Sequence, residues 1–229
     1  MSGTLALVGG AEWRDGCEFD RELLAASGTD EVVVMPTGAA YEHPDRLVDA
    51  AEQWFARLGA RVRPLMVLAR PHALDPDHVA AISQARFVYL AGPSPLHLRS
   101  VLMHSPLWDA LVAAWQDGAT LAGTSAGAMV LCDPMVDPRG GAFTLGLGLV
   151  GRLALIPHAD AWSEDKRHRT LQIAPIGTPV VGIDERTALL HGPDGRWHIA
   201  GAGAATVWVD GSEQDLDALP PAVTARPAG

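Results

Sequence analysis

The chain has 229 residues, of which 48% are hydrophobic and 19% charged, a composition typical of a globular protein with a substantial core. Its formal net charge of −10 argues against general nucleic-acid binding and against a polybasic membrane surface. The two cysteines, Cys17 and Cys132, are too few for a disulfide framework and fit a reducing compartment. No apolar run is long enough to cross a bilayer and no signal peptide is recognisable, so we expect a cytoplasmic protein.

The first 130 residues alternate between strand and helix patterns. We expect strands at five apolar or β-branched runs: Thr4–Val8, Glu31–Met35, Arg61–Val67, Arg86–Ala91 and Ala119–Ala122. We expect helices between them: Asp20–Ala26, Pro44–Leu58, a helix from Asp75 through Ala85, and one helix or two over Leu96–Gln116. This alternation predicts an α/β fold, with a doubly wound, mostly parallel sheet and helices on both faces.

The second part of the chain has a different rhythm. Residues 133–149 are rich in Pro and Gly, and residues 157–170 are polar, so we expect loops there with some helix after residue 157. Strand patterns return at Val150–Ile156, Val180–Asp184 and Ala188–His191, while Trp197–Ala200 and Thr206–Val209 predict a closing hairpin or meander at the sheet edge. We expect a single domain over residues 1–229, with a loosely ordered tail over residues 216–229.

The strongest chemical signal is the run Gly123-Thr124-Ser125-Ala126-Gly127 between an expected strand and a helix-compatible segment. Small residues on both sides of a serine allow strand and helix to approach closely at a sharp turn. Such a turn exposes the hydroxyl group, and the following helix places backbone N–H groups beside it. The pattern predicts Ser125 as a nucleophile, against the alternative of a packed turn whose serine merely caps the helix.

A serine nucleophile needs a base within hydrogen-bond reach. His158 follows the strand that ends at Ile156, and groups at the carboxyl ends of parallel strands gather at one edge of the sheet. We therefore predict His158 as the base, with His191 and His198 as alternatives. A loop histidine bonded to the backbone is the non-catalytic interpretation.

A third group should orient the imidazole. Glu185 stands at the end of Val180–Asp184, so it can reach the same edge of the sheet, and we predict it for this role. Asp184 is adjacent but points to the opposite face if the strand continues that far. Asp160, two residues after His158, is a nearer competitor. The residues alone leave the choice among these three acids open.

Other chemistries find little support. No His-Glu-x-x-His or Cys-x-x-Cys motif occurs, and no glycine-rich nucleotide loop follows a strand, so we predict neither a metal nor a cofactor. Arg167 and Arg169 fall in a run of charged residues that we interpret as a solvated face. The Gly9-Gly10 pair after the first strand lets the backbone pass close to another group. The expected partner is a small peptide or amide substrate, without nucleic acid or membrane, and a homodimer is a candidate assembly.

Three segments together resemble one family: Gly123–Ala128, the run from Leu147 to His158, and the run from Gly182 to Ala188. In combination they are similar to the peptidase E and cyanophycinase family of serine peptidases, family S51, over most of the chain to about Val209. The resemblance implies a class I glutamine amidotransferase-like, flavodoxin-like fold.

The resemblance also implies roles for individual residues. Ser125 would be the nucleophile, His158 the base and Glu185 its partner, and the backbone N–H groups of Gly92 and Ala126 would form the oxyanion hole. The implied substrates are peptides that carry aspartate: Asp-X dipeptides, or the aspartate–arginine polymer cyanophycin and related β-aspartyl bonds.

Two features depart from the family pattern. Pro93, Ser94 and Pro95 follow Gly92 where further glycine and a polar Asn or Gln are usual, and proline has no N–H to donate. If the second oxyanion donor belongs at position 93, it is missing, a loss commonly worth about 10²–10³ in rate. The regular arginines that follow the histidine in cyanophycinases are replaced by residues 159–162, Ala-Asp-Ala-Trp, which argues against polymer specificity.

Three hypotheses result. The first is a serine-type peptidase or amidohydrolase that acts through a Ser-His-Glu triad and an acyl-enzyme. The second is a catalytically weak or inactive relative that binds a small ligand or a protein partner. The third is an α/β-hydrolase esterase, in which Asp184 or Glu185 would act with His191 or His198, although the spacing is short for that fold.

Overall fold

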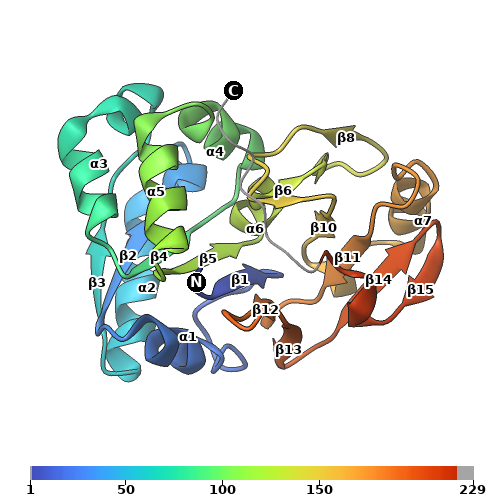
Figure 1. The fold of residues 1–229 in the computed structure, drawn as a ribbon, viewed down its shortest axis with the longest axis horizontal. Coiled ribbons are helices and arrows are strands. Elements are labelled where there is room, and N and C mark those ends of the chain that lie inside the picture. The colour runs from blue at the N-terminus through green and yellow to red at the C-terminus, as the bar shows by residue number, and fades with distance from the viewer. Residues whose placement is uncertain (1, 221–229) are drawn as a thin grey trace.

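A seven-stranded sheet forms the centre of the computed structural model, which describes residues 2–220 (Figure 1). Its strand order is β13-β12-β1-β5-β4-β2-β3. The parallel strands are β1 (Leu5–Val8), β5 (Thr120–Thr124), β4 (Phe87–Leu90), β2 (Glu31–Met35) and β3 (Arg61–Pro64). The strands β12 (Thr187–His191) and β13 (Trp197–Gly201) extend the β1 side in antiparallel fashion. The expected α/β fold with a mostly parallel sheet is confirmed.

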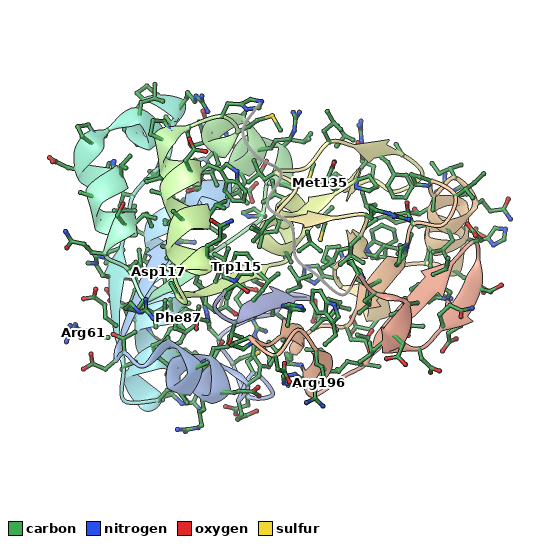
Figure 2. All side chains as sticks on the ribbon, in the orientation of Figure 1. Arg61, Phe87, Trp115, Asp117, Met135 and Arg196 are labelled. Atoms are coloured by element: carbon green, nitrogen blue, oxygen red, sulfur yellow. The ribbon has the colours of Figure 1, made fainter. Side chains whose placement is uncertain are left out.

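Helices cover both faces of this sheet because the inner strands carry apolar residues on both faces. In β1, Ala6 and Val8 belong to one apolar cluster, whereas Leu5 and Leu7 belong to the other. One face carries α1 (Asp20–Ser27) and α2 (Pro44–Arg57); the other carries α3 (Pro76–Ser83), α4 (Pro95–Leu102), α5 (Pro106–Gln116) and α6 (Ala126–Leu131). Figure 2 labels one buried aromatic residue from each cluster, Phe87 and Trp115.

Side-chain caps decide where several helices begin. The Leu96–Gln116 segment forms two helices, because Ser105 starts a new one by accepting the backbone N–H of Trp108 at 3.1 Å. Ser94 caps α4 in the same way, accepting from the backbone N–H of His97 at 3.3 Å. Two short 3₁₀ helices, η1 (Thr37–Ala39) and η2 (Arg70–Leu74), complete this half of the chain.

A second sheet lies beside the first and contains β10 (Ala154–Ile156), β11 (Val180–Ile183), β14 (Ala205–Val209) and β15 (Ser212–Gln214). It lies towards the right of Figure 1, next to α7 (Glu164–Gln172), where β14 and β15 are drawn in red. β10 and β11 are parallel, whereas β14 and β15 are antiparallel to their neighbours. Apolar residues of both sheets, such as Leu7 and Val181, belong to one cluster.

The predicted closing hairpin of Trp197–Ala200 with Thr206–Val209 is wrong, because the two strands join different sheets. β13 pairs with β12, whereas β14 pairs with β11. Gly201 ends β13 at a φ of +119°, a conformation that few other residues adopt in a strand. On β14, the ring of Trp208 fills the space that a side chain at Gly182 would need, since a Cβ there would lie 2.9 Å from it.

The Pro- and Gly-rich segment after α6 contains no helix, as expected, but it forms short strands where we expected loops. These strands are β6 (Cys132–Asp133), β7 (Met135–Val136), β8 (Phe143–Thr144) and β9 (Val150–Gly151). The single strand expected at Val150–Ile156 is interrupted, because Arg152 adopts a left-handed conformation with a φ of 58°.

Two further 3₁₀ helices occur, η3 (Ala159–Ala161) and η4 (Leu216–Ala218). Of the tail expected to be loosely ordered, residues 221–229 lie outside the described part of the chain. Within residues 2–220, every helix is too short or too polar to span a bilayer.

A buried carboxyl group lies between the sheet and α2. Asp20 is fully buried and accepts a hydrogen bond from the indole Nε1 of Trp54 at 2.9 Å. Burial raises the pKa of the Asp20 carboxyl from 3.8 to about 8; the Trp54 bond opposes this rise and the charge of Glu12 adds to it. The folded protein therefore holds a proton here at neutral pH that the unfolded chain releases.

This difference predicts a specific pH dependence of stability. The contribution of protonated Asp20 is fully present below its unfolded pKa of 3.8 and is lost as pH rises towards its folded pKa of about 8. Asp20→Asn keeps an acceptor for Trp54 without the titration. The unfolding free energy of this variant, measured relative to that of the wild type, should rise by up to about 1.4 kcal/mol for each pH unit between pH 3.8 and about 8.

Urea unfolding of both proteins at several pH values measures this gain. The buried groups Cys17 and Tyr89 do not interfere, because burial raises their pKa values above this window. A free-energy difference between variant and wild type that stays constant with pH would contradict the prediction.

Candidate active site

Ser125 occupies a strained turn between β5 and α6. Its backbone has φ 49° and ψ −109°, well outside the regions that a non-glycine residue normally adopts. The neighbouring glycines make the turn feasible. A Cβ at Gly127 would lie 2.1 Å from the carbonyl oxygen of Leu90, and one at Gly123 would lie 2.6 Å from Gly127. Strand and helix thus approach as closely as the Gly-x-Ser-x-Gly spacing predicts.

A hydrogen-bonded chain connects the three side chains that the sequence singles out. The Oγ of Ser125 lies 3.0 Å from Nε2 of His158. The Nδ1 of the same imidazole lies 2.8 Å from Oε1 of Glu185. The side chains of His158 and Glu185 are 34% and 38% exposed, so solvent and small molecules can reach this chain. A hydroxyl, an imidazole and a carboxylate in this order form the arrangement used for nucleophilic catalysis.

From the sequence we expected these three residues at one edge of a single sheet, but they follow strands of two different sheets. Ser125 follows β5 of the large sheet, whereas His158 follows β10 and Glu185 follows β11 of the small sheet. β10 and β11 are parallel neighbours, so their carboxyl ends do lie together. The site therefore forms where the ends of two sheets meet.

The end of β1 joins the three segments through backbone hydrogen bonds. The carbonyl of Val8 accepts the N–H of Ser125 at 2.9 Å, and the carbonyl of Gly9 accepts the N–H of His158 at 2.8 Å. The carbonyl of Gly10 accepts the N–H of Arg186, next to Glu185, at 2.8 Å.

The imidazole of His158 packs directly on Gly10, because a Cβ at that position would lie 2.2–2.7 Å from three ring atoms. The close backbone approach expected at Gly9-Gly10 is therefore an approach to His158 at Gly10 and to the backbone of Asp184 at Gly9.

The competing acids make other contacts. Asp184 accepts the backbone N–H of Ala204 at 3.0 Å. Asp160 accepts the backbone N–H of Glu185 at 3.0 Å. Among the described residues, Glu185 is the acid that bonds the His158 ring.

The competing histidines lie elsewhere. His191 pairs with Leu5 at the start of β1, because β12 runs antiparallel to β1, which places His191 at the edge opposite to Ser125. Its ring packs on Trp197, with centroids 4.7 Å apart. His198 bonds Glu22 at 2.9 Å. The esterase arrangement that needed either histidine beside Ser125 is not formed.

The arginines after His158 lie along α7. Arg167 lies over the ring of Trp208, 6.0 Å from its centroid, and Arg169 is exposed, with Nε 3.4 Å from the carbonyl of Asp165. Neither guanidinium contacts the triad within the described residues. The interpretation of Arg169 as part of a solvated face agrees with this position.

Gly92 lies directly against the turn that carries Ser125. A Cβ at Gly92 would lie 3.5 Å from the backbone nitrogen of Ala126 and 3.8 Å from Cβ of Ser125. Ala126 is the first residue of α6, so its N–H has no acceptor within the helix. Both residues thus lie directly beside Ser125.

One residue of this region has no sequence signal. Glu12 accepts the Oγ1 hydrogen of Thr124, the residue before Ser125, at 2.9 Å. It also lines a pocket of about 360 Å³ that contains Arg14, Glu42 and Arg46. Glu12 lies in an irregular loop after β1, so neither periodicity nor a motif could indicate its contact with Thr124. Within residues 2–220, no group of three or more His, Cys, Asp or Glu side chains is arranged to hold a metal ion.

Comparisons with known proteins identify the family to which the chain belongs. The family model described as peptidase family S51 matches residues 5–196. The solved structure of a peptidase from an acI-B1 Actinobacterium is 31% identical, with a TM-score of 0.84 over 93% of both chains. A cyanophycinase of Synechococcus elongatus is 27% identical over 90% of this chain and 67% of its own length, and a peptidase E of Citrobacter koseri is 28% identical over 68% and 69%. Since the family model spans most of the chain, the protein belongs to peptidase family S51.

Proposed function

We propose that this protein is a serine peptidase or amidohydrolase that cleaves small peptides through an acyl-enzyme. The continuous chain of hydrogen bonds from Ser125 through His158 to Glu185 carries the proposal. His158 takes the hydroxyl proton at Nε2 while the oxygen of Ser125 attacks the scissile carbonyl carbon. Glu185 holds the ring through Nδ1 and stabilises the imidazolium ion that forms. His158 then gives the proton to the leaving amine, and water hydrolyses the ester.

The oxyanion of the tetrahedral intermediate needs donors beside Ser125. In this proposal the backbone N–H groups of Ala126 and Gly92 supply them. The N–H of Ala126 is free of intrahelical bonds, and Gly92 packs against the same turn without a side chain to block it. Under this assignment the missing N–H of Pro93 does not matter.

The proposed substrates are peptides with an aspartyl or β-aspartyl residue at the cleaved bond. Relatives named cyanophycinase and peptidase E support a peptide bond as the target. The pocket beside Glu12 contains two guanidinium groups, Arg14 and Arg46, and among the described residues neither forms an ion pair. The same pocket also contains the carboxylates of Glu12 and Glu42, so the proposal rests on the two guanidinium groups and not on a net positive charge. Guanidinium groups bind carboxylates well, and in this proposal Arg14 and Arg46 bind the acidic side chain of the substrate.

A second candidate function rests on the loop after Gly92. If the oxyanion donor belongs to position 93, Pro93 cannot supply it. The protein would then be a weak or inactive family member that binds a small ligand or a protein partner. Reactivity of Ser125 separates the two candidates.

Ser125→Ala should abolish both labelling by a fluorophosphonate probe and peptide hydrolysis, while the thermal midpoint stays close to that of the wild type. In the labelling reaction the Oγ–P bond forms, fluoride leaves, and the hydroxyl proton passes to His158. Gel fluorescence of the native protein measures it. Labelling that persists in Ser125→Ala, or a wild type that never reacts, would contradict the proposed catalytic role.

Gly10→Ala should slow labelling at least about 100-fold, because the new methyl group must displace the His158 ring from Ser125. Gly28→Ala is the matched control. It also introduces Cβ at a positive φ, 67°, but meets nothing within 4 Å. Equal labelling rates in the two variants would show that strain alone, and not the position of His158, explains any loss.

A panel of dipeptides tests the substrate. Asp-Leu or β-Asp-Leu should be cleaved faster than Asn-Leu, and Arg46→Gln should raise KM for the acidic peptide without changing the fluorophosphonate labelling rate. Liquid chromatography of the released leucine measures turnover. Equal rates for acidic and neutral peptides would reject the aspartyl preference and leave the triad assignment intact.

A further inference from the structure

Asp160 connects the two segments that carry His158 and Glu185. It lies in η3, two residues after His158, and its Oδ1 accepts the backbone N–H of Glu185 at 3.0 Å. The carboxylate of Glu185 returns to Nδ1 of His158 at 2.8 Å. The contacts therefore form a closed ring, from the His158 backbone through Asp160 and Glu185 back to the His158 ring.

The packing of η3 keeps Asp160 in this place. The N–H of Ala161 donates to the carbonyl of His158 at 2.9 Å, which closes the 3₁₀ turn. Ala159 sits against β11 at Gly182, where a Cβ would lie 3.1 Å from the Ala159 methyl carbon. The turn is thus seated on the strand that leads to Glu185, so Asp160 faces the end of that strand.

We propose that Asp160 is a positioning residue for catalysis, acting through Glu185 and not on the substrate. Glu185 lies just after the end of β11. The next residue, Arg186, donates its backbone N–H to the carbonyl of Gly10. Asp160 fixes the N–H of Glu185 itself. Without this bond the backbone of Glu185 can rotate, and its carboxylate leaves the optimal line to Nδ1. This inference rests on the proposed function.

The experiment compares fluorophosphonate labelling rates in the wild type and five variants of the full chain. Asp160→Ala should lower the rate about 10- to 100-fold, the range typical for a lost supporting contact or a misplaced catalytic group. Asp160→Asn should stay within about threefold of the wild type, because its amide oxygen can accept the same N–H. Rescue by this conservative variant would identify the hydrogen bond as the relevant contact.

Asp184→Ala is the matched control. Asp184 directly precedes Glu185 in the chain, and its side chain accepts the backbone N–H of Ala204. The substitution therefore removes an equivalent hydrogen bond between an Asp side chain and a backbone N–H. It should lower the thermal midpoint about as much as Asp160→Ala but keep the labelling rate within about threefold of the wild type. Equal losses of rate in both variants would reduce Asp160 to a purely structural role and overturn the proposal.

A double-mutant cycle tests whether Asp160 acts through Glu185. In the Glu185→Ala background, Asp160→Ala should cost less than about twofold, because no carboxylate is left to position. A full loss in that background would overturn the proposal. If the wild type reacts and depends on Ser125 but Asp160→Ala has no effect, only this inference fails; an unreactive wild type counts against the proposed function as well.

Discussion

Backbone hydrogen bonds to the end of β1 hold the candidate active site together. The consecutive carbonyl groups of residues 8, 9 and 10 accept N–H groups from Ser125, His158 and Arg186, which come from three distant parts of the chain. β1 is central and fully buried, so its end is a rigid reference point. Gly10 also provides the space that the His158 ring occupies. A side chain or a shift at this point would therefore disturb nucleophile, base and acid together.

The division of the site between two sheets has a structural consequence. The large sheet supplies Ser125 and the borders of the proposed oxyanion hole, whereas the small sheet supplies His158 and Glu185. One apolar cluster spans both sheets, so their relative position is fixed by packing and not by a single contact. Parallel pairing of β10 with β11 brings the base and the acid to the same level. This arrangement explains how residues 33 and 27 positions apart form one chain of hydrogen bonds.

Two features distinguish this member of peptidase family S51 from the pattern that the sequence resembles. Pro93 follows Gly92 and has no N–H, so in the proposed mechanism the backbone N–H groups of Gly92 and Ala126 are the donors to the oxyanion. Asp160 lies in the segment after His158 in which cyanophycinases have a regular series of arginines, and here it accepts a hydrogen bond from the backbone N–H of Glu185. Arg14 and Arg46 line a pocket together with Glu12. The carboxylate of Glu12 accepts a hydrogen bond from Thr124, the residue before Ser125.

The sequence by itself determined the order and approximate positions of the main strands and helices up to α6, because periodicity, β-branched runs and capping residues act over a few neighbours. It left open whether Leu96–Gln116 forms one helix or two, and it extended β3 beyond its end at Pro64. It also determined the Ser125 turn, since only glycine fits at positions 123 and 127, where a Cβ would clash with neighbouring backbone atoms. Only the tertiary structure decided that His158 rather than His191 meets Ser125, and that Glu185 rather than Asp160 or Asp184 meets His158. It also assigned β13 and β14 to different sheets. Those choices depend on strand direction and pairing between distant segments, which no local pattern encodes.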